Sequence, residues 1–201
     1  KERDKQWLGV PFTQFFKLTG EWRETFPLTP RSAIAARFYA GAVWSYHNST
    51  MAPYADLFSV GGANSIRAFA IRSIGPGSYH PANGKWSYVD QVGNLKFEAN
   101  VEYRFPIIGG LAGALFVDAG NVWLMKADPA RPGGDIDAKR FFKEVALGTG
   151  LGLRYDLDFL VLRFDIGVGI HAPYDTGRSS YYNMRRFWDS LGFHIAVGYP
   201  F

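Results

Sequence analysis

The stretch from Asn94 to Phe105 restricts the fold more than any other part of the chain, because its twelve residues alternate strictly between polar and apolar. The apolar series runs from Leu95 to Phe105 and the polar series from Asn94 to Arg104. A period of two predicts a β-strand with two chemically different faces. At about 3.3 Å per residue and a tilt of ~40°, such a strand reaches roughly 30 Å, the height of an outer-membrane barrel strand.

Similar alternation recurs along the chain and predicts seven long strands in all. The other six cover Phe12–Trp22, Arg31–Trp44, Leu111–Trp123, Val145–Tyr155, Leu160–Ile170 and Leu191–Phe201. The predicted connections alternate in length. The short links are Phe26–Pro30, Pro106–Gly110 and Leu157–Asp158, and the long ones are Ser45–Gly93, Leu124–Phe142 and His171–Ser190. Short turns at one end and long loops at the other are typical of outer-membrane barrels, whose long loops lie outside the cell.

Two other fold classes fit the sequence less well than the barrel. A soluble β-sandwich would have shorter strands and more frequent turns, and the polar faces here are rich in glycine and charge, which suits a confined lumen. A helical membrane protein is excluded, because no apolar run approaches the ~18 residues that a spanning helix needs. The mean hydropathy of −0.11 fits a barrel that averages an apolar outer face with a polar lumen. The predicted class is therefore an all-β, antiparallel transmembrane β-barrel.

Composition excludes several kinds of chemistry. The chain has no cysteine, which removes disulfides, zinc–thiolate sites and thiol nucleophiles. The four histidines lack metal-ligand spacing, and no cluster of acid, base and nucleophile can be assembled. A formal charge of +4 is too mild to indicate nucleic acid as a partner. We therefore expect no enzyme activity, no cofactor and no metal.

An ordered set of short motifs carries a family resemblance. The motifs are Gly61-Gly62 with Arg67-Ala68-Phe69, Ser73-Ile74-Gly75-Pro76, Val101–Pro106, Phe116–Trp123, Gly150–Tyr155, Leu162–Asp165 and the final Phe201. In this order they resemble the outer membrane protein assembly factor superfamily, the bacterial surface antigen group that includes BamA and TamA. The resemblance runs from about Phe12 to Phe201. The sequence between Gly61 and Tyr79 looks most like that of assembly factors from Bacteroidetes.

The resemblance implies a location in the outer membrane of a Gram-negative bacterium and a domain layout. Residues 1–201 would be the C-terminal seven or eight strands of a barrel of about sixteen strands, an even number as in other bacterial barrels. The extracellular loop 45–93 would fold into the lumen. No polypeptide-transport-associated (POTRA) domain is present in the sequence. A missed N-terminal strand would instead give a small eight-stranded barrel.

The same resemblance implies a set of residues that we call the loop lock: Arg67, Phe69, Glu102 and Asp118. The family's loop tip carries an Arg-Gly-Phe/Tyr motif, whose arginine meets acidic residues on the next two strands. Independently of the family, both carboxylates fall on the polar faces predicted above, so a lumenal Arg67 could form charge-assisted bonds with them. The alternative is a solvated arginine in a watery lumen. Ala68 replaces the motif glycine, and a positive φ there would be strained.

The last predicted strand alternates to a terminal aromatic residue. The alternating series is Phe193, Ile195, Val197, Tyr199 and Phe201. It resembles the C-terminal signal by which assembly machinery recognises barrel substrates. The physical basis would be strand addition, in which a strand edge offers backbone hydrogen bonds and alternate side chains fix the register. Pro200 lacks an amide hydrogen and weakens pairing at that end.

The function that the resemblance implies is insertion, assembly or translocation of outer-membrane proteins through a barrel with an openable seam. The alternatives are a two-partner-secretion transporter and a passive pore or structural barrel. Expected partners are outer-membrane lipids including lipopolysaccharide, unfolded outer-membrane proteins, and the N-terminal barrel and POTRA region or periplasmic partners.

Overall fold

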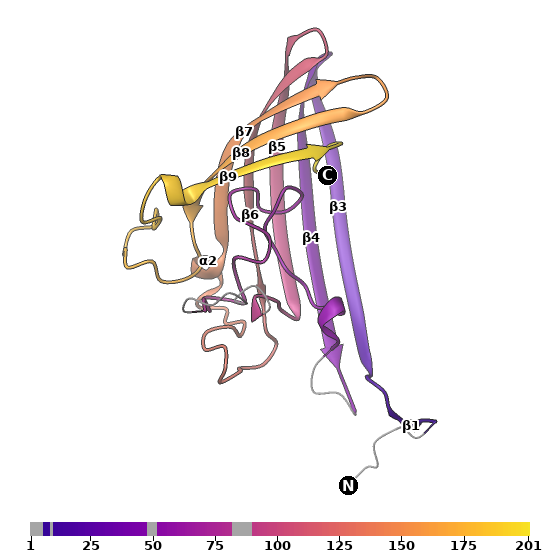
Figure 1. The fold of residues 1–201 in the computed structure, drawn as a ribbon, viewed down its shortest axis with the longest axis vertical. Coiled ribbons are helices and arrows are strands. Elements are labelled where there is room, and N and C mark those ends of the chain that lie inside the picture. The colour runs from indigo at the N-terminus through magenta and orange to yellow at the C-terminus, as the bar shows by residue number, and fades with distance from the viewer. Residues whose placement is uncertain (1–5, 9, 48–51, 82–89) are drawn as a thin grey trace.

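One antiparallel sheet dominates the computed structural model, which describes residues 6–8, 10–47, 52–81 and 90–201. Its seven strands follow one another in chain order, from β3 to β9 (Figure 1). They are β3 (Phe15–Thr29), β4 (Ser32–Ser45), β5 (Leu95–Ile108), β6 (Leu111–Trp123), β7 (Ala146–Asp156), β8 (Val161–His171) and β9 (Leu191–Val197). The small elements are β1 (Gln6–Trp7), β2 (Val10–Pro11), η1 (Tyr54–Asp56), α2 (Phe141–Glu144) and η2 (Trp188–Ser190).

The sheet is strongly curled but open, because its edge strands β3 and β9 each pair with a single neighbour. The curl brings the C-terminal tail back to β5, where the Arg104 guanidinium lies 4.3 Å from the centre of the Tyr199 ring. The predicted all-β antiparallel class is therefore confirmed, with seven strands that do not close into a complete barrel.

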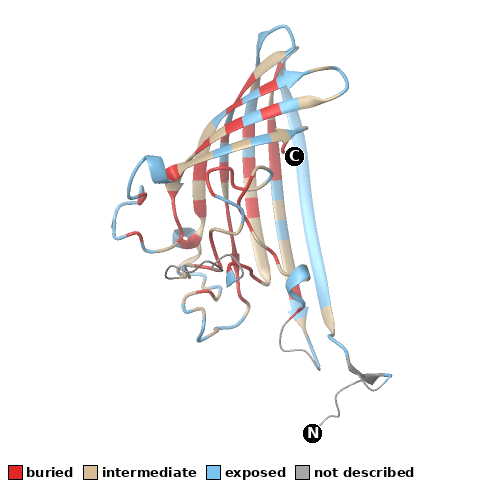
Figure 2. Cartoon of the chain, in the orientation of Figure 1, coloured by how far each residue is buried: buried red, intermediate tan, exposed pale blue. Residues whose placement is uncertain are grey.

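Burial alternates along the strands in the opposite sense to a soluble sheet (Figure 2). Charged residues on the concave face are buried: Glu102, Asp118 and Asp165 are all 0% exposed. Apolar residues on the convex face are exposed, and Ile195 reaches 82%. An apolar outer surface around a polar interior is the pattern that a membrane-spanning barrel requires. Among the described residues, no helix is both long and apolar enough to cross a membrane.

Two strands are longer than predicted at their short-turn ends. The sequence predicts that the first long strand ends at Trp22, but β3 continues to Thr29 with a register shift between Pro27 and Thr29. Pro27 is tolerated because β3 is an edge strand, where a missing amide hydrogen costs least. Likewise β5 continues to Ile108, with a register shift after Pro106. The two short links that the sequence predicts around these prolines, Phe26–Pro30 and Pro106–Gly110, are therefore shorter in the structure.

The last strand is shorter than predicted. The sequence predicts a strand to Phe201, but β9 ends at Val197. The next residue, Gly198, adopts a φ of +82°, which glycine enters without strain and which turns the chain out of the ladder. Tyr199 and Phe201 therefore lie outside β9, and the Arg104 guanidinium stands over both rings.

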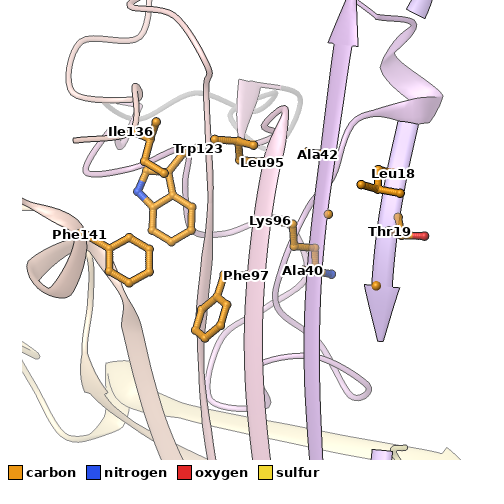
Figure 3. Close-up of a pocket in the computed structure, with 12 residues that line it drawn as sticks. Leu18, Thr19, Ala40, Ala42, Leu95, Lys96, Phe97, Trp123, Ile136 and Phe141 are labelled. Atoms are coloured by element: carbon orange, nitrogen blue, oxygen red, sulfur yellow. The ribbon is translucent and has the colours of Figure 1, made fainter. Parts of the chain in front are cut away.

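The long connections gather at the opposite end of the sheet from the short turns (Figure 1). The connection after β6 turns outward and packs on the convex face. There Phe141 of α2 stacks on Trp123, with ring centres 5.1 Å apart, and the Trp123 indole donates to Glu144 at 2.8 Å. Figure 3 shows these rings beside Phe97 of β5. The connection after β4 takes the other direction and enters the concave side, where it meets the buried charges.

Candidate functional site

Arg67, from the connection between β4 and β5, forms the centre of the buried polar interior. Its guanidinium holds Asp118 of β6 with two bonds, from Nε at 2.8 Å and from the second terminal nitrogen at 2.9 Å. Its backbone amide donates to the same carboxylate at 3.0 Å. Both side chains are 1% exposed or less. The arrangement is a bidentate arginine–carboxylate pair, the geometry that gives the strongest charge-assisted bonding.

Glu102 of β5 takes the remaining face of the guanidinium. Arg67 donates to it at 2.5 Å, while the Phe116 ring lies against the guanidinium with its centre 3.5 Å away. Burial opposes the charge on Arg67, but the bonds and charges of Asp118 and Glu102 outweigh it and raise the pKa of Arg67 above its ordinary value. The guanidinium therefore stays charged inside the lumen.

Further ion pairs from β7 and β8 extend the site. Arg154 donates to Glu102 at 2.9 Å and to Asp165 at 2.5 Å. Arg163 lies 3.4 Å from Asp165. Together with Arg67 and Asp118, the cluster contains equal numbers of buried cations and carboxylates. A balanced cluster is what makes so many charges tolerable away from water.

Two polar residues before Arg67 also bind the sheet. Arg163 donates to the Asn64 side chain at 2.5 Å, and Arg37 of β4 donates to the Asn64 carbonyl at 3.2 Å. Asn100 of β5 donates to the Ser65 carbonyl at 2.9 Å, and the Ser65 hydroxyl donates to Glu98. The loop tip is thus held by strands on both sides of the curl, and not by Arg67 alone.

The tip can approach the sheet because glycines line the wall opposite it. A Cβ on Gly167 of β8 would lie 2.6 Å from the Arg67 carbonyl oxygen and 2.8 Å from the Ala68 Cα. Cβ atoms on Gly148 of β7 and Gly192 of β9 would also collide with the tip. The strain anticipated at Ala68 is not found, because Ala68 is not among the described residues with positive φ. The glycines that allow this close approach lie in the strands, so the loop tip itself does not need one.

His194 of β9 is a contact that the sequence did not identify. Its Nε2 lies 2.8 Å from the carbonyl oxygen of Arg67 and acts as the donor. The only available signal was its place on the polar face of the last strand, which does not say what it touches. Through His194 and Gly192, the edge strand β9 contacts the same residue that binds β5 and β6.

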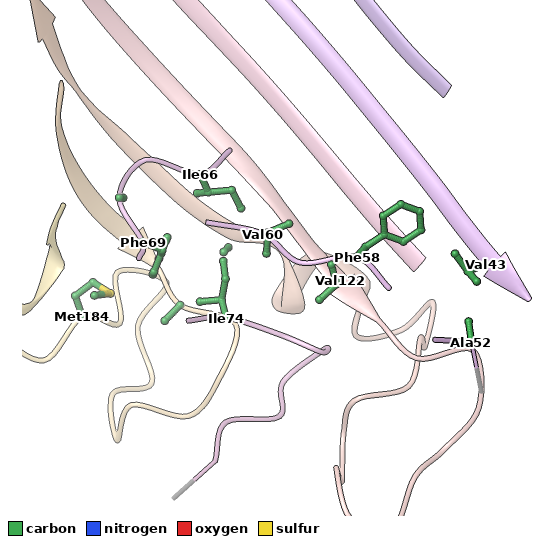
Figure 4. Close-up of a cluster of buried hydrophobic side chains, with 12 residues drawn as sticks. Val43, Ala52, Phe58, Val60, Ile66, Phe69, Ile74, Val122 and Met184 are labelled. Atoms are coloured by element: carbon green, nitrogen blue, oxygen red, sulfur yellow. The ribbon is translucent and has the colours of Figure 1, made fainter. Parts of the chain in front are cut away.

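Phe69 belongs to a separate apolar cluster and makes no ion-pair contact. The buried cluster joins the loop to the strand ends and to Met184 of the last long connection (Figure 4). Its main members are Val43, Phe58, Val60, Ile66, Phe69, Ile74, Val122 and Met184. Burial of these side chains holds the base of the loop, while the charges hold its tip.

The residues of the predicted C-terminal signal divide into two groups. Phe193, Ile195 and Val197 of β9 point outward and are 61%, 82% and 70% exposed. Tyr199 and Phe201 follow the strand and stack on Arg104, as described above. The structure brings Arg67, Glu102 and Asp118 together but places none of the signal residues in that cluster.

Comparisons with known proteins agree with this architecture. The chain is 29% identical over 115 residues to the outer membrane protein assembly factor BamA of Neisseria meningitidis serogroup B, covering 55% of this chain and 14% of that protein. The crystal structure of Haemophilus ducreyi BamA lacking POTRA domains 1–3 matches with a TM-score of 0.63 at 21% identity, over 92% of this chain and 35% of that one. CdiB from Acinetobacter baumannii matches with a TM-score of 0.51 at 16% identity, over 92% and 27%.

This chain therefore spans about a third or less of the proteins that it matches. The Omp85 superfamily domain matches residues 8–201, almost the whole chain, and confirms the resemblance drawn from the motifs. The chain belongs to the Omp85 superfamily.

Proposed function

We propose that this chain is the C-terminal part of an outer-membrane barrel that inserts other barrel proteins into the membrane. Superfamily members of the BamA kind are outer-membrane proteins of Gram-negative bacteria, and they act in assembly or translocation rather than as enzymes. In the proposal, residues 1–201 supply the last seven strands, and the strands and periplasmic POTRA region that complete the protein precede them. Its partners are unfolded outer-membrane proteins.

The buried Arg67–Asp118 pair is the observation that carries the proposal. A loop packed into the lumen narrows the open path that a passive channel needs. An insertase, by contrast, must keep the membrane sealed while its wall changes shape. The bidentate bonds at 2.8 and 2.9 Å and the near-complete burial of both partners are what a stable plug needs. We assign Arg67, Glu102 and Asp118 to holding the tip, and Phe69 to anchoring its base.

The free edge of β9 supports the second half of the proposal. Among the described strands, β9 pairs only with β8, so its other edge can offer backbone donors and acceptors to an incoming strand. In the complete barrel this edge would form the seam with the first strand. The exposed alternate residues Phe193, Ile195 and Val197 would keep the incoming strand in register on the lipid side.

Depletion of the full-length protein tests this function. If it is a general insertase, several unrelated outer-membrane barrels will lose their folded, heat-modifiable form together. Loss of a single secreted protein, with barrel levels unchanged, would contradict the proposal and identify a secretion transporter. A large, steady conductance from the purified protein in planar bilayers would contradict the plugged lumen and favour a passive pore.

A further inference from the structure

Small residues create a hollow on the convex face of the sheet. On β3 the outward series runs through Leu18 and Gly20, and on β4 it runs through Ala42 and Ala40, which pair with them. Aromatic pairs close the two ends of this row: Phe16 with Trp44 at 5.4 Å and Trp22 with Phe38 at 5.9 Å between ring centres. Between these aromatic pairs, the bottom of the hollow is therefore formed by glycine and alanine.

The connection after β6 turns this hollow into a groove. Phe141 of α2 stacks on Trp123 and lies 6.1 Å from the Phe97 ring, so these rings build a wall along one side of the floor. Figure 3 shows Ile136, Trp123 and Phe141 on one side and Leu18 on the other, with Ala40 and Ala42 between them. The groove has a volume of about 560 Å³, within the range of specific ligand sites.

A second hollow begins one residue further along the same strands, toward the long loops. It has a volume of about 350 Å³ and is lined by Trp44, Asn94 and Leu124 together with the charged residues Lys126, Asp128 and Arg131. Arg131 pairs with Asp128 at 2.8 Å, while the Lys126 side chain is exposed. The polar pocket, which contains an exposed cation, therefore lies beyond the Phe16–Trp44 ring pair that closes this end of the groove.

We propose that this two-part site binds one lipopolysaccharide molecule, with an acyl chain in the groove and a phosphate of its headgroup at Lys126. The groove lies on the lipid-facing surface, and the polar pocket lies on its side toward the long loops, which in such barrels face the outside of the cell. The lipid of that leaflet in a Gram-negative outer membrane is lipopolysaccharide. Lys139 and Lys143, on either side of Phe141 in the sequence, are also exposed.

None of the residues that line the two hollows belongs to the loop lock. The site rests on the location of the protein in the outer membrane and not on the proposed insertase activity. Either proposal can therefore fail alone: depletion tests the insertase role, and lipid retention tests the groove.

Native mass spectrometry of the full-length protein tests the site, using rough lipopolysaccharide added to protein that has been stripped of lipid in detergent. The wild type is expected to retain one molecule. Ala40→Trp fills the groove floor and should lower retention about tenfold, since two or more acyl methylenes lose their buried position. Ala119→Trp is the matched control, because Ala119 follows the exposed Val117 on the outward series of β6 but does not line the groove.

Two further sets of variants test the same site. Lys126→Glu should also lower retention, whereas Arg31→Glu, at an exposed cation in the short turn between β3 and β4, should not. Ala42→Phe replaces Ala40→Trp if that variant does not fold. Unchanged retention in the filled variants would overturn the site. Equal retention of phosphatidylethanolamine by the wild type would overturn its assignment to lipopolysaccharide.

Discussion

Asp118 should matter more to the docked loop than Glu102, although both carboxylates bind Arg67. Asp118 accepts four bonds: three from Arg67, including its backbone amide, and one from the Asn100 side chain at 2.9 Å. Asp118→Asn keeps one oxygen but turns an amide NH₂ group toward two of these donors. It also removes the charge that balances Arg67. Breaking a buried pair in this way costs about 3–5 kcal/mol.

Glu102→Gln should weaken docking of the loop less, because Glu102 makes one bond to Arg67 and its other partners, Arg154 and Arg104, stay on the strands when the loop leaves. One Glu102 oxygen accepts from both Arg67 and Arg154, and the other accepts from Arg104. A glutamine can keep its oxygen on the first pair and turn its amide toward Arg104, whose side chain is 18% exposed and can bind water instead. The expected cost is about 1–2 kcal/mol. A difference of about 2 kcal/mol corresponds to roughly thirtyfold in the population of released loop.

A single cysteine can report this population, because the chain has none of its own. Val60 lies in the apolar cluster at the base of the loop and is 1% exposed, so Val60→Cys reacts with a maleimide only when the loop leaves its place. When opening and closing are fast compared with labelling, the rate follows the open population. We expect the rate to rise about 100-fold or more with Asp118→Asn and about tenfold with Glu102→Gln.

The order of the two labelling rates tests whether Asp118 holds the loop more strongly than Glu102 does. Equal rates would mean that the remaining partners of each carboxylate do not set its importance. A faster rate with Glu102→Gln would contradict the account of Asp118 as the main acceptor. No change with either variant would show that the apolar cluster alone holds the loop. Val60→Cys in the otherwise unchanged protein is the reference in each case.

Three further predictions concern the surroundings of the tip. His194→Ala should speed labelling of the cysteine reporter about fivefold, as expected for one lost hydrogen bond to the Arg67 carbonyl, and His194→Gln, which can still donate, should restore most of the protection. Gly192→Ala should displace the tip and speed labelling, whereas Gly20→Ala, where a Cβ meets nothing within 4 Å, should leave the rate unchanged. Arg104→Ala removes the cation over the Tyr199 and Phe201 rings, at a cost of about 1 kcal/mol, and should speed amide hydrogen exchange in residues 198–201; an unchanged exchange rate would refute that contact.

The alternation of polar and apolar residues predicted the strands well where one face contacts lipid and the other faces the polar lumen. Leu111–Trp123 is recovered as β6 without change, because lipid on one side and a charged lumen on the other leave only one register. The ends were less predictable. Pro27 and Pro106 suggest turns in the sequence, and only the position of β3 at the edge and the register shifts in the ladder show why both stay within strands.

The site was predictable in its charges but not in its shape. The polar face of each strand locates Glu102 and Asp118, and the family motif supplies their partner Arg67. Nothing local indicates that Gly167 faces the tip, because that depends on which strands lie opposite the loop once the sheet has curled. The outward packing of Phe141 was hidden for a related reason: the connection after β6 has no period that would assign it a face.

The contacts of Arg67 join two parts of the proposed mechanism that would otherwise be separate. Its guanidinium is held by β5 and β6, while its carbonyl is held by His194 of β9, the strand with the free edge. Movement of β9 away from the lumen must therefore either break the bond to His194 or pull on the tip. Because linkage is reciprocal, release of the tip makes β9 easier to displace by the same factor as displacement of β9 makes the tip easier to release. In the proposed mechanism the plug and the seam would then be coupled, and a substrate strand that drew β9 outward would loosen the loop as it bound.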